Sequence, residues 1–253
     1  MFLFKDFITK DICRKHKDFL YVFGDNMAGY GLGGQAIIRN EPNSYGIVTK
    51  WEPTMSPAAF FSDTDNEIAK VKRTLDELDE LNEKGKIIIL PLNPVGSGYA
   101  KLDKYSPKVY KLICDWWDSK PKLYTGNFSS MKKHKNKDII DITRVQPRWL
   151  KGAKKETRLA PKLNILMDYK KGIINDDDYI YEFDKVLRKL LPIEIIKDIL
   201  IDDKDKVLCC YCTKDTFCHR HLVGEWLEDA LDITINEVGK YRTKRKLGKA
   251  KED

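Results

Sequence analysis

The sequence predicts an α/β protein of two domains, each with a mainly parallel or mixed sheet flanked by helices. Short apolar runs of strand length alternate with segments whose apolar residues recur at helical spacing, the pattern of layered α/β folds. In two places a glycine-rich stretch directly follows such an apolar run. The composition shifts toward Lys, Ser and Gly over 121–135, which indicates a boundary in a chain of 253 residues.

These features divide the chain into three parts. Residues 1–120 form the first predicted domain and residues 121–238 the second. Residues 239–253 are charged and basic and lack apolar spacing, so a flexible tail is expected there.

In the first domain, a capping box of Thr64 and Glu67 begins a predicted helix, and Gly85 ends it. The apolar positions of that helix, from Ile68 to Leu81, recur at helical spacing. The other predicted elements are strands over 1–4, 19–23, 44–50 and 86–92 and a helix over 107–117.

In the second domain, an apolar run over 206–211 predicts a buried strand that leads into a cysteine-rich segment. A helix is expected to follow Cys218 and to continue through Leu231. The other predicted elements are strands over 122–125 and 138–142 and helices over 179–191 and 192–201, the last beginning at Pro192.

Composition narrows the class of protein. The chain is 42% hydrophobic and 34% charged, its longest apolar runs are strand-sized, and no secretory signal is visible. The six cysteines show no disulfide framework, so we expect a cytoplasmic protein without a membrane partner. The net charge of +7 is concentrated in Lys132–Lys137 and Lys240–Lys251, which permits nucleic-acid contact, although solvated lysine is the commoner explanation.

The first glycine-rich stretch, Gly24–Ala36, contains five glycines in thirteen residues. Glycine lets the backbone take positive φ and lets a ligand approach the N–H groups. A strand, a glycine turn and a helix starting near Gln35 would together make an anion cradle, with phosphate as its usual ligand. The alternative is a tight turn without a ligand. The spacing matches neither the dinucleotide fingerprint nor the Walker loop.

The second glycine-rich stretch, Asn93–Ala100, follows the strand over 86–92. Ligands of parallel sheets sit at the carboxyl ends of strands. Because both stretches leave strand ends, we expect them to face one pocket.

The motifs of this half resemble macrodomain-like proteins of bacteria and phages. The resemblance is carried by Val22–Ala36, Thr49-Lys50 and Leu90–Gly98, with Gly24-Asp25-Asn26 in place of the family's Asn-Ala-Ala-Asn string. It implies an ADP-ribose- or NAD-derived nucleotide, with Asn26 at the distal ribose and the glycine loops at the phosphates. The implied ligand-binding residues are Gly24, Asn26, Gly31, Gly33, Gly34, Gln35, Lys50, Asn93, Gly96, Ser97 and Gly98.

Asp25 is the candidate general base that would activate water in such a pocket, with Asn26 as its positioning neighbour. The alternative is a turn-forming carboxylate that accepts hydrogen bonds from nearby backbone N–H groups.

Cysteine and histidine cluster over 209–221, where three interpretations compete. A zinc site would use Cys209 or Cys210, Cys212, Cys218 and His219 or His221, although the paired C-x-x-C halves are missing. A reactive thiolate at Cys218 would have its pKa lowered by the helix start, His219 and Arg220. In the third interpretation the cysteines are small buried core residues.

The second half also resembles a family, the domain of unknown function 488. The resemblance is carried by Ile140–Arg144 with Pro147, by Val207–Tyr211 and by Phe217–Leu227, which includes Cys218-His219-Arg220. It implies a fold and a pocket but no reaction. Arg144, Arg148, His219 and Arg220 are expected to converge at one sheet edge, where an anion is the natural ligand.

Three functional hypotheses follow. The first is binding of an ADP-ribose- or NAD-derived nucleotide or an ADP-ribosylated substrate, with its hydrolysis left open. The alternative is a protein that binds nucleic acid or processes its ends through Lys132–Lys137, Arg144, Arg148, Trp149 and the basic tail. In the third, the cysteines form a zinc or redox sensor that regulates the first domain. No motif requires a cofactor, and zinc at Cys209, Cys212, Cys218 and His221 is the open alternative.

Overall fold

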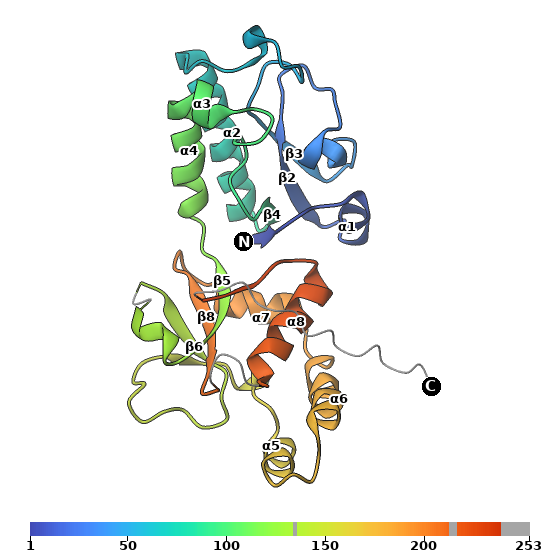
Figure 1. The fold of residues 1–253 in the computed structure, drawn as a ribbon, viewed down its shortest axis with the longest axis vertical. Coiled ribbons are helices and arrows are strands. Elements are labelled where there is room, and N and C mark those ends of the chain that lie inside the picture. The colour runs from blue at the N-terminus through green and yellow to red at the C-terminus, as the bar shows by residue number, and fades with distance from the viewer. Residues whose placement is uncertain (134–135, 213–216, 239–253) are drawn as a thin grey trace. The chain divides into compact units, whose positions relative to one another are not determined.

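The computed structural model describes residues 1–133, 136–212 and 217–238. The chain divides into two compact units, Met1–Lys120 and Pro121–Asp253 (Figure 1). Each contains a sheet of parallel strands flanked by helices, so the predicted α/β class with two such domains is confirmed. The predicted tail over 239–253 lies outside the described residues. No helix in the described part of the chain is long and apolar enough to cross a bilayer.

The first unit is built on a four-stranded sheet in the order β1-β4-β2-β3, with every pair parallel. The carboxyl ends of its strands therefore share one edge. The strands are β1 (Phe2–Lys5), β2 (Phe19–Asp25), β3 (Ser44–Val48) and β4 (Ile87–Pro91). The helices are α1 (Lys10–Lys15), α2 (Asp65–Glu83), α3 (Leu102–Tyr105) and α4 (Pro107–Asp118), with short 3-10 segments η1 (Gly34–Ile38) and η2 (Pro57–Ala59).

Helices α2 and α4 pack on one face of this sheet. Val71 and Leu75 of α2 and Ile113 of α4 belong to the same buried cluster as Val22 and Ile88 of the strands. The capping box at Thr64 and Glu67 is present as predicted, and the chain leaves α2 through a positive φ at Gly85. The helical periodicity read from the sequence thus corresponds to the face that the sheet buries.

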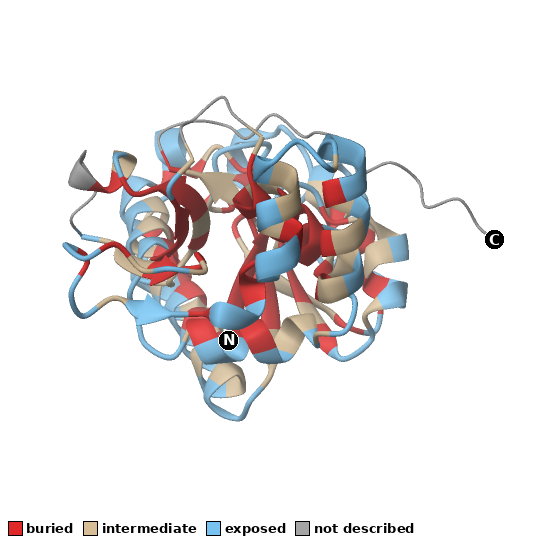
Figure 2. Cartoon of the chain, turned by 90° about the horizontal axis from the view of Figure 1, so that it is seen from below, coloured by how far each residue is buried: buried red, intermediate tan, exposed pale blue. Residues whose placement is uncertain are grey.

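The second unit carries a five-stranded parallel sheet in the order β7-β6-β8-β5-β9. Its strands are β5 (Leu123–Asn127), β6 (Asp138–Asp141), β7 (Lys154–Lys155), β8 (Lys206–Cys210) and β9 (Asn236–Glu237). Its helices are α5 (Leu163–Lys170), α6 (Asp176–Leu187), α7 (Pro192–Ile199) and α8 (His219–Leu231), with 3-10 segments η3 (Ser130–Lys133) and η4 (Thr157–Leu159). In both units the buried residues lie along the strands and the inward sides of the helices (Figure 2).

Residues of β8 alternate between the two faces of the second sheet. Val207 and Cys209 belong to a buried cluster with Phe128 and Met131 on one face. Because successive strand side chains point to opposite faces, Cys210 projects to the other face and meets the start of α8. This alternation decides which cysteine can join the site described below.

Several boundaries differ from those predicted. Strand β2 continues to Asp25, so Gly24 pairs with Ile47 inside the sheet. The expected helix near Gln35 is only the 3-10 segment η1, because Gly34 has a φ of +58° and Pro42 follows too soon for an α-helix to develop. An anion site at an α-helix N-terminus is therefore not available here. The short helices α1, α3 and α5 and the two-residue strands β7 and β9 were not predicted.

Candidate functional sites at the carboxyl edges of the two sheets

The two glycine loops leave neighbouring strands of the first sheet. The first follows β2 and the second follows β4, and these strands pair in parallel. A Cβ placed on Gly34 would lie 3.6 Å from the ring of Tyr99, so the two loops approach each other closely. The ammonium of Lys50, after β3, donates a hydrogen bond of 3.1 Å to the carbonyl oxygen of Tyr99. The loops and Lys50 thus meet at one edge.

Lys50 is buried in this arrangement, with 5% of its surface exposed. Its ammonium lies 4.0 Å from the centroid of the Phe60 ring. Burial, with a smaller contribution from the charge of Lys101, lowers the pKa of Lys50. A cation held under the second loop offers positive charge to an anion without being part of the solvated surface.

Asn26 is the first residue after β2 and is buried, with 8% of its surface exposed. Its Nδ2 donates to the carbonyl oxygen of Tyr30 at 2.8 Å, which fixes the orientation of the amide. Its Oδ1 has no hydrogen-bond partner in the described part of the chain. A buried acceptor without a partner is unfavourable unless a ligand or water supplies a donor.

One oxygen of the Asp25 carboxylate, Oδ1, is engaged by structural partners. Arg39 forms an ion pair with Asp25 Oδ1, and the backbone N–H of Asn26 donates to the same oxygen. Arg39 also donates to the carbonyl oxygen of Gly31 at 2.9 Å. The Asp25–Arg39 pair therefore holds the first glycine loop, which supports the alternative interpretation of Asp25 as a turn carboxylate, while its role as a general base stays a prediction.

Other residues predicted to bind the ligand have structural partners. Both ends of the Gln35 amide bond the backbone of Ile8, with Nε2 donating to its carbonyl oxygen at 2.7 Å. Gly24 lets the second loop approach, since a Cβ there would lie 3.4 Å from Val95. Of the remaining predicted residues, Gly31, Gly34 and Gly96 have positive φ, and Asn93, Gly33, Ser97 and Gly98 are exposed.

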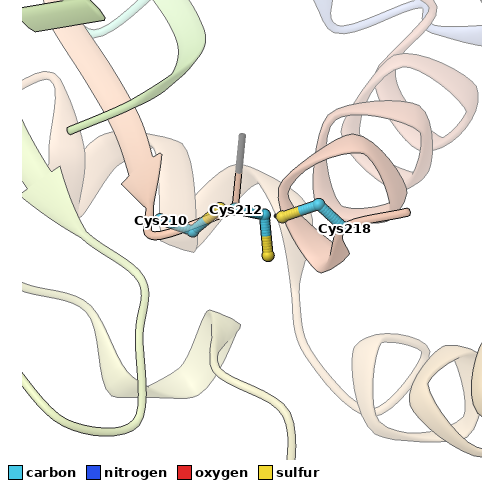
Figure 3. Close-up of side chains that lie close together, drawn as sticks. All are labelled: Cys210, Cys212 and Cys218. Carbon is cyan, nitrogen blue, oxygen red and sulfur yellow. Dashed lines mark hydrogen bonds between the residues drawn. The ribbon is translucent and has the colours of Figure 1, made fainter. Parts of the chain in front are cut away.

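The second site lies at the carboxyl edge of the second sheet, where β8 leads into α8. The Sγ atoms of Cys210, Cys212 and Cys218 all lie within 4.8 Å of one another (Figure 3). Cys210 ends β8, and Cys218 is the N-cap of α8 and accepts from the N–H of Arg220. Cys210 Sγ and Cys218 Sγ are 2.7 Å apart. Cys210, and not Cys209, therefore joins the cluster, because Cys209 points into the core on the opposite face.

The pKa values of the three thiols are shifted in different directions. Burial is the largest cause that raises the pKa of Cys218, the opposite direction to the one expected from the helix start and its neighbouring cations. Hydrogen bonding with Cys212 raises the pKa of Cys210 to about 11. The pKa of Cys212, the only half-exposed member, is lowered mainly by hydrogen bonds from Cys210 and Cys218. Of the three, Cys212 is therefore the thiol whose surroundings favour the deprotonated form.

His219 is the first residue of α8 and is held against β6. Its Nε2–H donates to the carbonyl oxygen of Ile142 at 2.9 Å, and its Nδ1 lies 3.9 Å from Cys218 Sγ. Burial lowers the pKa of His219, so the imidazole is neutral at pH 7. Because a carbonyl oxygen only accepts, the proton sits on Nε2 and Nδ1 faces the thiols as an acceptor.

Arg220 is fully buried and links the cysteines to β9. Its Nη1 donates to Cys210 Sγ at 3.3 Å and to the carbonyl oxygen of Cys212 at 3.0 Å. Its Nη2 donates to Glu237 Oε1 at 2.9 Å, and Glu237 Oε2 is 2.9 Å from His221 Nε2. His221 therefore pairs with Glu237 and is not among the donor atoms that cluster with the sulfurs.

The predicted convergence of arginines on an anion is not what the structure contains. Arg220 is engaged as described, and Arg144 donates to the carbonyl oxygens of Ala160 and Pro161. Arg148 is exposed. Arg144 thus holds the segment at Ala160 and Pro161, and Arg220 holds Glu237 and the cysteine segment.

Sequence reasoning missed the role of Asp141, the last residue of β6. Asp141 is fully buried, and its Oδ1 accepts from the N–H and the hydroxyl of Thr143 at 2.8 and 2.6 Å. Its Oδ2 has no hydrogen-bond partner in the described residues. The Asp-x-x-Arg spacing at 141–144 is the sequence signal that could have found it.

Three aromatic side chains, Phe128, Trp149 and Tyr211, form a group in the second unit. Trp149 and Tyr211 are 63% and 55% exposed, and each packs edge-on against Phe128, with ring centroids 5.7 and 5.2 Å apart. Tyr211 lies between two of the clustered cysteines in the sequence. The three rings therefore lie on the Cys209 side of the second sheet, where Phe128 packs.

Comparison with known families separates the two units. Residues 125–231 match the family model described as "Active DUF488-N3 subclade". This match supports the resemblance found in the second half of the sequence. Residues 3–116 match the model described as "Family of unknown function (DUF7831)", so the resemblance of this half to macrodomains has no support from family models. No curated protein and no solved structure matches the chain.

Proposed function

We propose that the first unit binds a phosphate-bearing nucleotide, of the ADP-ribose or NAD-derived class, between its two glycine loops. The observation that carries the proposal is the buried Oδ1 of Asn26, which has no hydrogen-bond partner among the described residues and lies at the edge where both loops begin. A ribose hydroxyl is a donor that would satisfy this oxygen.

The surroundings of Asn26 suit a ligand that carries both a negatively charged diphosphate and an aromatic nucleobase. The buried ammonium of Lys50 lies under the second loop and supplies positive charge for a diphosphate. Tyr30 and Tyr99, one on each loop, are 54% and 74% exposed, which is enough surface for a nucleobase to stack on. The proposal is for binding alone, since Asp25 is committed to Arg39.

The test is isothermal titration of ADP-ribose and of NAD into the intact protein at physiological salt. We expect saturable binding that falls at least tenfold in Gly33→Glu, because the added carboxylate repels a phosphate. A Cβ on Gly33 meets no atom within 4 Å and its φ is −73°, so the fold tolerates the change. Gly33→Gln is the control of matched size without charge, and it should bind more tightly than Gly33→Glu. Absence of heat with both nucleotides in the wild-type protein would exclude the proposal.

A second candidate function, binding of single-stranded nucleic acid by the second unit, rests on the exposed rings of Trp149 and Tyr211. Nucleic-acid bases stack on exposed aromatic rings of this kind, and a nearby cation such as the exposed Arg148 would contact the phosphate backbone of the nucleic acid. The basic segment expected to help is only partly described, and Lys137 within it pairs with Asp205. Fluorescence anisotropy with a labelled oligonucleotide should show affinity that falls steeply with salt and weakens in Trp149→Ala. Affinity equal in wild type and Trp149→Ala would argue against it.

A further inference from the structure

The geometry points to a zinc site in the second unit, with Cys210, Cys212 and Cys218 as its three protein ligands and a fourth position open to water or substrate. This inference concerns a different unit from the proposed nucleotide site and does not depend on it. Three donor atoms from one strand end, one turn and one helix cap meet within 4.8 Å. Thiolate sulfur is the preferred donor of zinc in proteins, and three protein ligands with one open position are typical of sites that carry chemistry.

The distances are compatible with the metal after a small adjustment. A tetrahedral ion with Zn–S bonds of about 2.3 Å places its sulfur ligands about 3.8 Å apart. The three sulfurs are already within 4.8 Å, while Cys210 Sγ and Cys218 Sγ, at 2.7 Å, must separate by about 1 Å. A side-chain rotation at Cys210 or Cys218 supplies such a shift without moving the backbone.

The charges around the cluster favour a divalent cation. Three thiolates would place three negative charges beside Arg220, whose single charge is already shared with Glu237. Isolated buried charges are strongly unfavourable. A zinc ion leaves the metal and its three thiolates with a net charge of −1, which the guanidinium of Arg220 meets directly through its hydrogen bond to Cys210 Sγ.

The competing occupant of this geometry is a disulfide. A Cys210–Cys218 bond would require the sulfurs to close from 2.7 Å to about 2.05 Å, which oxidises two thiols and removes two ligands from the metal. The half-exposed Cys212 lies between these two cysteines in the chain, and its thiol would take no part in that disulfide. A zinc ion employs all three sulfurs, whereas a disulfide employs two, and this difference favours the metal.

The test is the metal content of the full-length protein, purified under reducing conditions from medium containing zinc. We expect about one zinc per chain, with loss of most of it in Cys212→Ser, the variant least expected to disturb folding because Cys212 is half-exposed. The matched control is Cys114→Ser, a half-exposed cysteine of the first unit, which should retain the metal.

Cobalt provides a second readout in the wild-type protein, which does not depend on any variant folding. Cobalt(II) added to the metal-free, reduced protein should give the thiolate charge-transfer band of tetrahedral sulfur coordination, and zinc should abolish it. Mass spectrometry after alkylation should show Cys212 protected by zinc and modified after chelation. The inference would be overturned if the reduced protein held no zinc and gave no cobalt band. It would also be overturned if the purified protein contained a Cys210–Cys218 disulfide and no zinc.

Discussion

Lys50 Nζ donates a 3.1 Å hydrogen bond to the carbonyl oxygen of Tyr99, forty-nine residues further along the chain. This bond ties the segment after β3 to the glycine loop after β4. A buried ammonium is costly to maintain unless its protons are bonded, and here the acceptor is a backbone carbonyl of the second glycine loop. Lys50 therefore organises the edge at which the nucleotide is proposed to bind.

Lys50→Met should change the pH dependence of stability. Burial lowers the pKa of Lys50 in the folded state, so over the pH range just below the ordinary lysine value of about 10.4 the unfolded chain binds more protons than the folded one. Folding stability contributed by this group therefore rises with pH in that range. Urea unfolding at pH 7 to 10 should show this rise in the wild type and less of it in Lys50→Met. Identical slopes would contradict the assignment, and Lys72→Met, which removes an exposed lysine of α2, serves as the control.

The Asp25–Arg39 pair should behave as a structural unit. The side chains are only 18% and 10% exposed, so Asp25→Asn or Arg39→Met should each lower the free energy of unfolding by about 1–3 kcal/mol. The double variant should lose less than the sum of the two, as expected for partners in one interaction. Denaturant unfolding of the four proteins measures the coupling. Additive losses would mean that the pair contributes nothing.

Gly96→Ala should destabilise the first unit, whereas Gly98→Ala should not. Gly96 has a φ of +112°, and a Cβ there would lie 2.5 Å from Cδ1 of Leu102, a fully buried side chain. We expect a loss of about 2–4 kcal/mol from backbone strain and overpacking. Gly98 lies in the same loop, but a Cβ there meets nothing within 4 Å. Thermal unfolding of both variants tests the contrast, and equal melting temperatures would show that the loop rearranges freely.

Much of the fold could be predicted because local chemistry and tertiary structure agree. The capping box at Thr64 and Glu67, the periodic apolar face of α2 and the uninterrupted apolar run of β4 each identify their element directly. Helices without such signals were missed. Helix α1 has six residues and α5 eight, too short for an apolar period to be visible.

The candidate sites were predictable in position but not in detail. That both glycine loops leave strand ends follows from the parallel sheet, and the sequence alone placed them together. Which atoms remain available depends on partners distant in sequence. Asp25 forms an ion pair with Arg39, and the Gln35 amide is hydrogen-bonded to the backbone of Ile8. Cys209 and Cys210 lie on opposite faces of β8, and only the face of Cys210 meets α8. A shift of β8 by one residue would exchange the two, and the sequence does not show which face packs against the helix.

Glu237 should make the second unit sensitive to acid. Burial alone would raise its pKa, but the hydrogen bond with His221 and the charges and hydrogen bonding of Arg220 and His221 outweigh it, so the pKa of Glu237 is lowered. A carboxylate with a lowered pKa in the folded state contributes stability that is fully present above its unfolded value of about 4.3 and is lost as the pH falls through the folded value.

In Glu237→Gln this acid-dependent contribution disappears, while the buried guanidinium of Arg220 loses its carboxylate partner. We therefore expect the variant to be less stable than the wild type at pH 7, by about 3–5 kcal/mol, and the difference to shrink below pH 4. Urea unfolding followed by fluorescence from pH 3 to 7 measures both effects. Glu182→Gln, which removes an exposed carboxylate on α6, is the control and should leave the stability near that of the wild type. A difference between wild type and Glu237→Gln that stays constant with pH would show that Glu237 is not the group whose protonation weakens the unit.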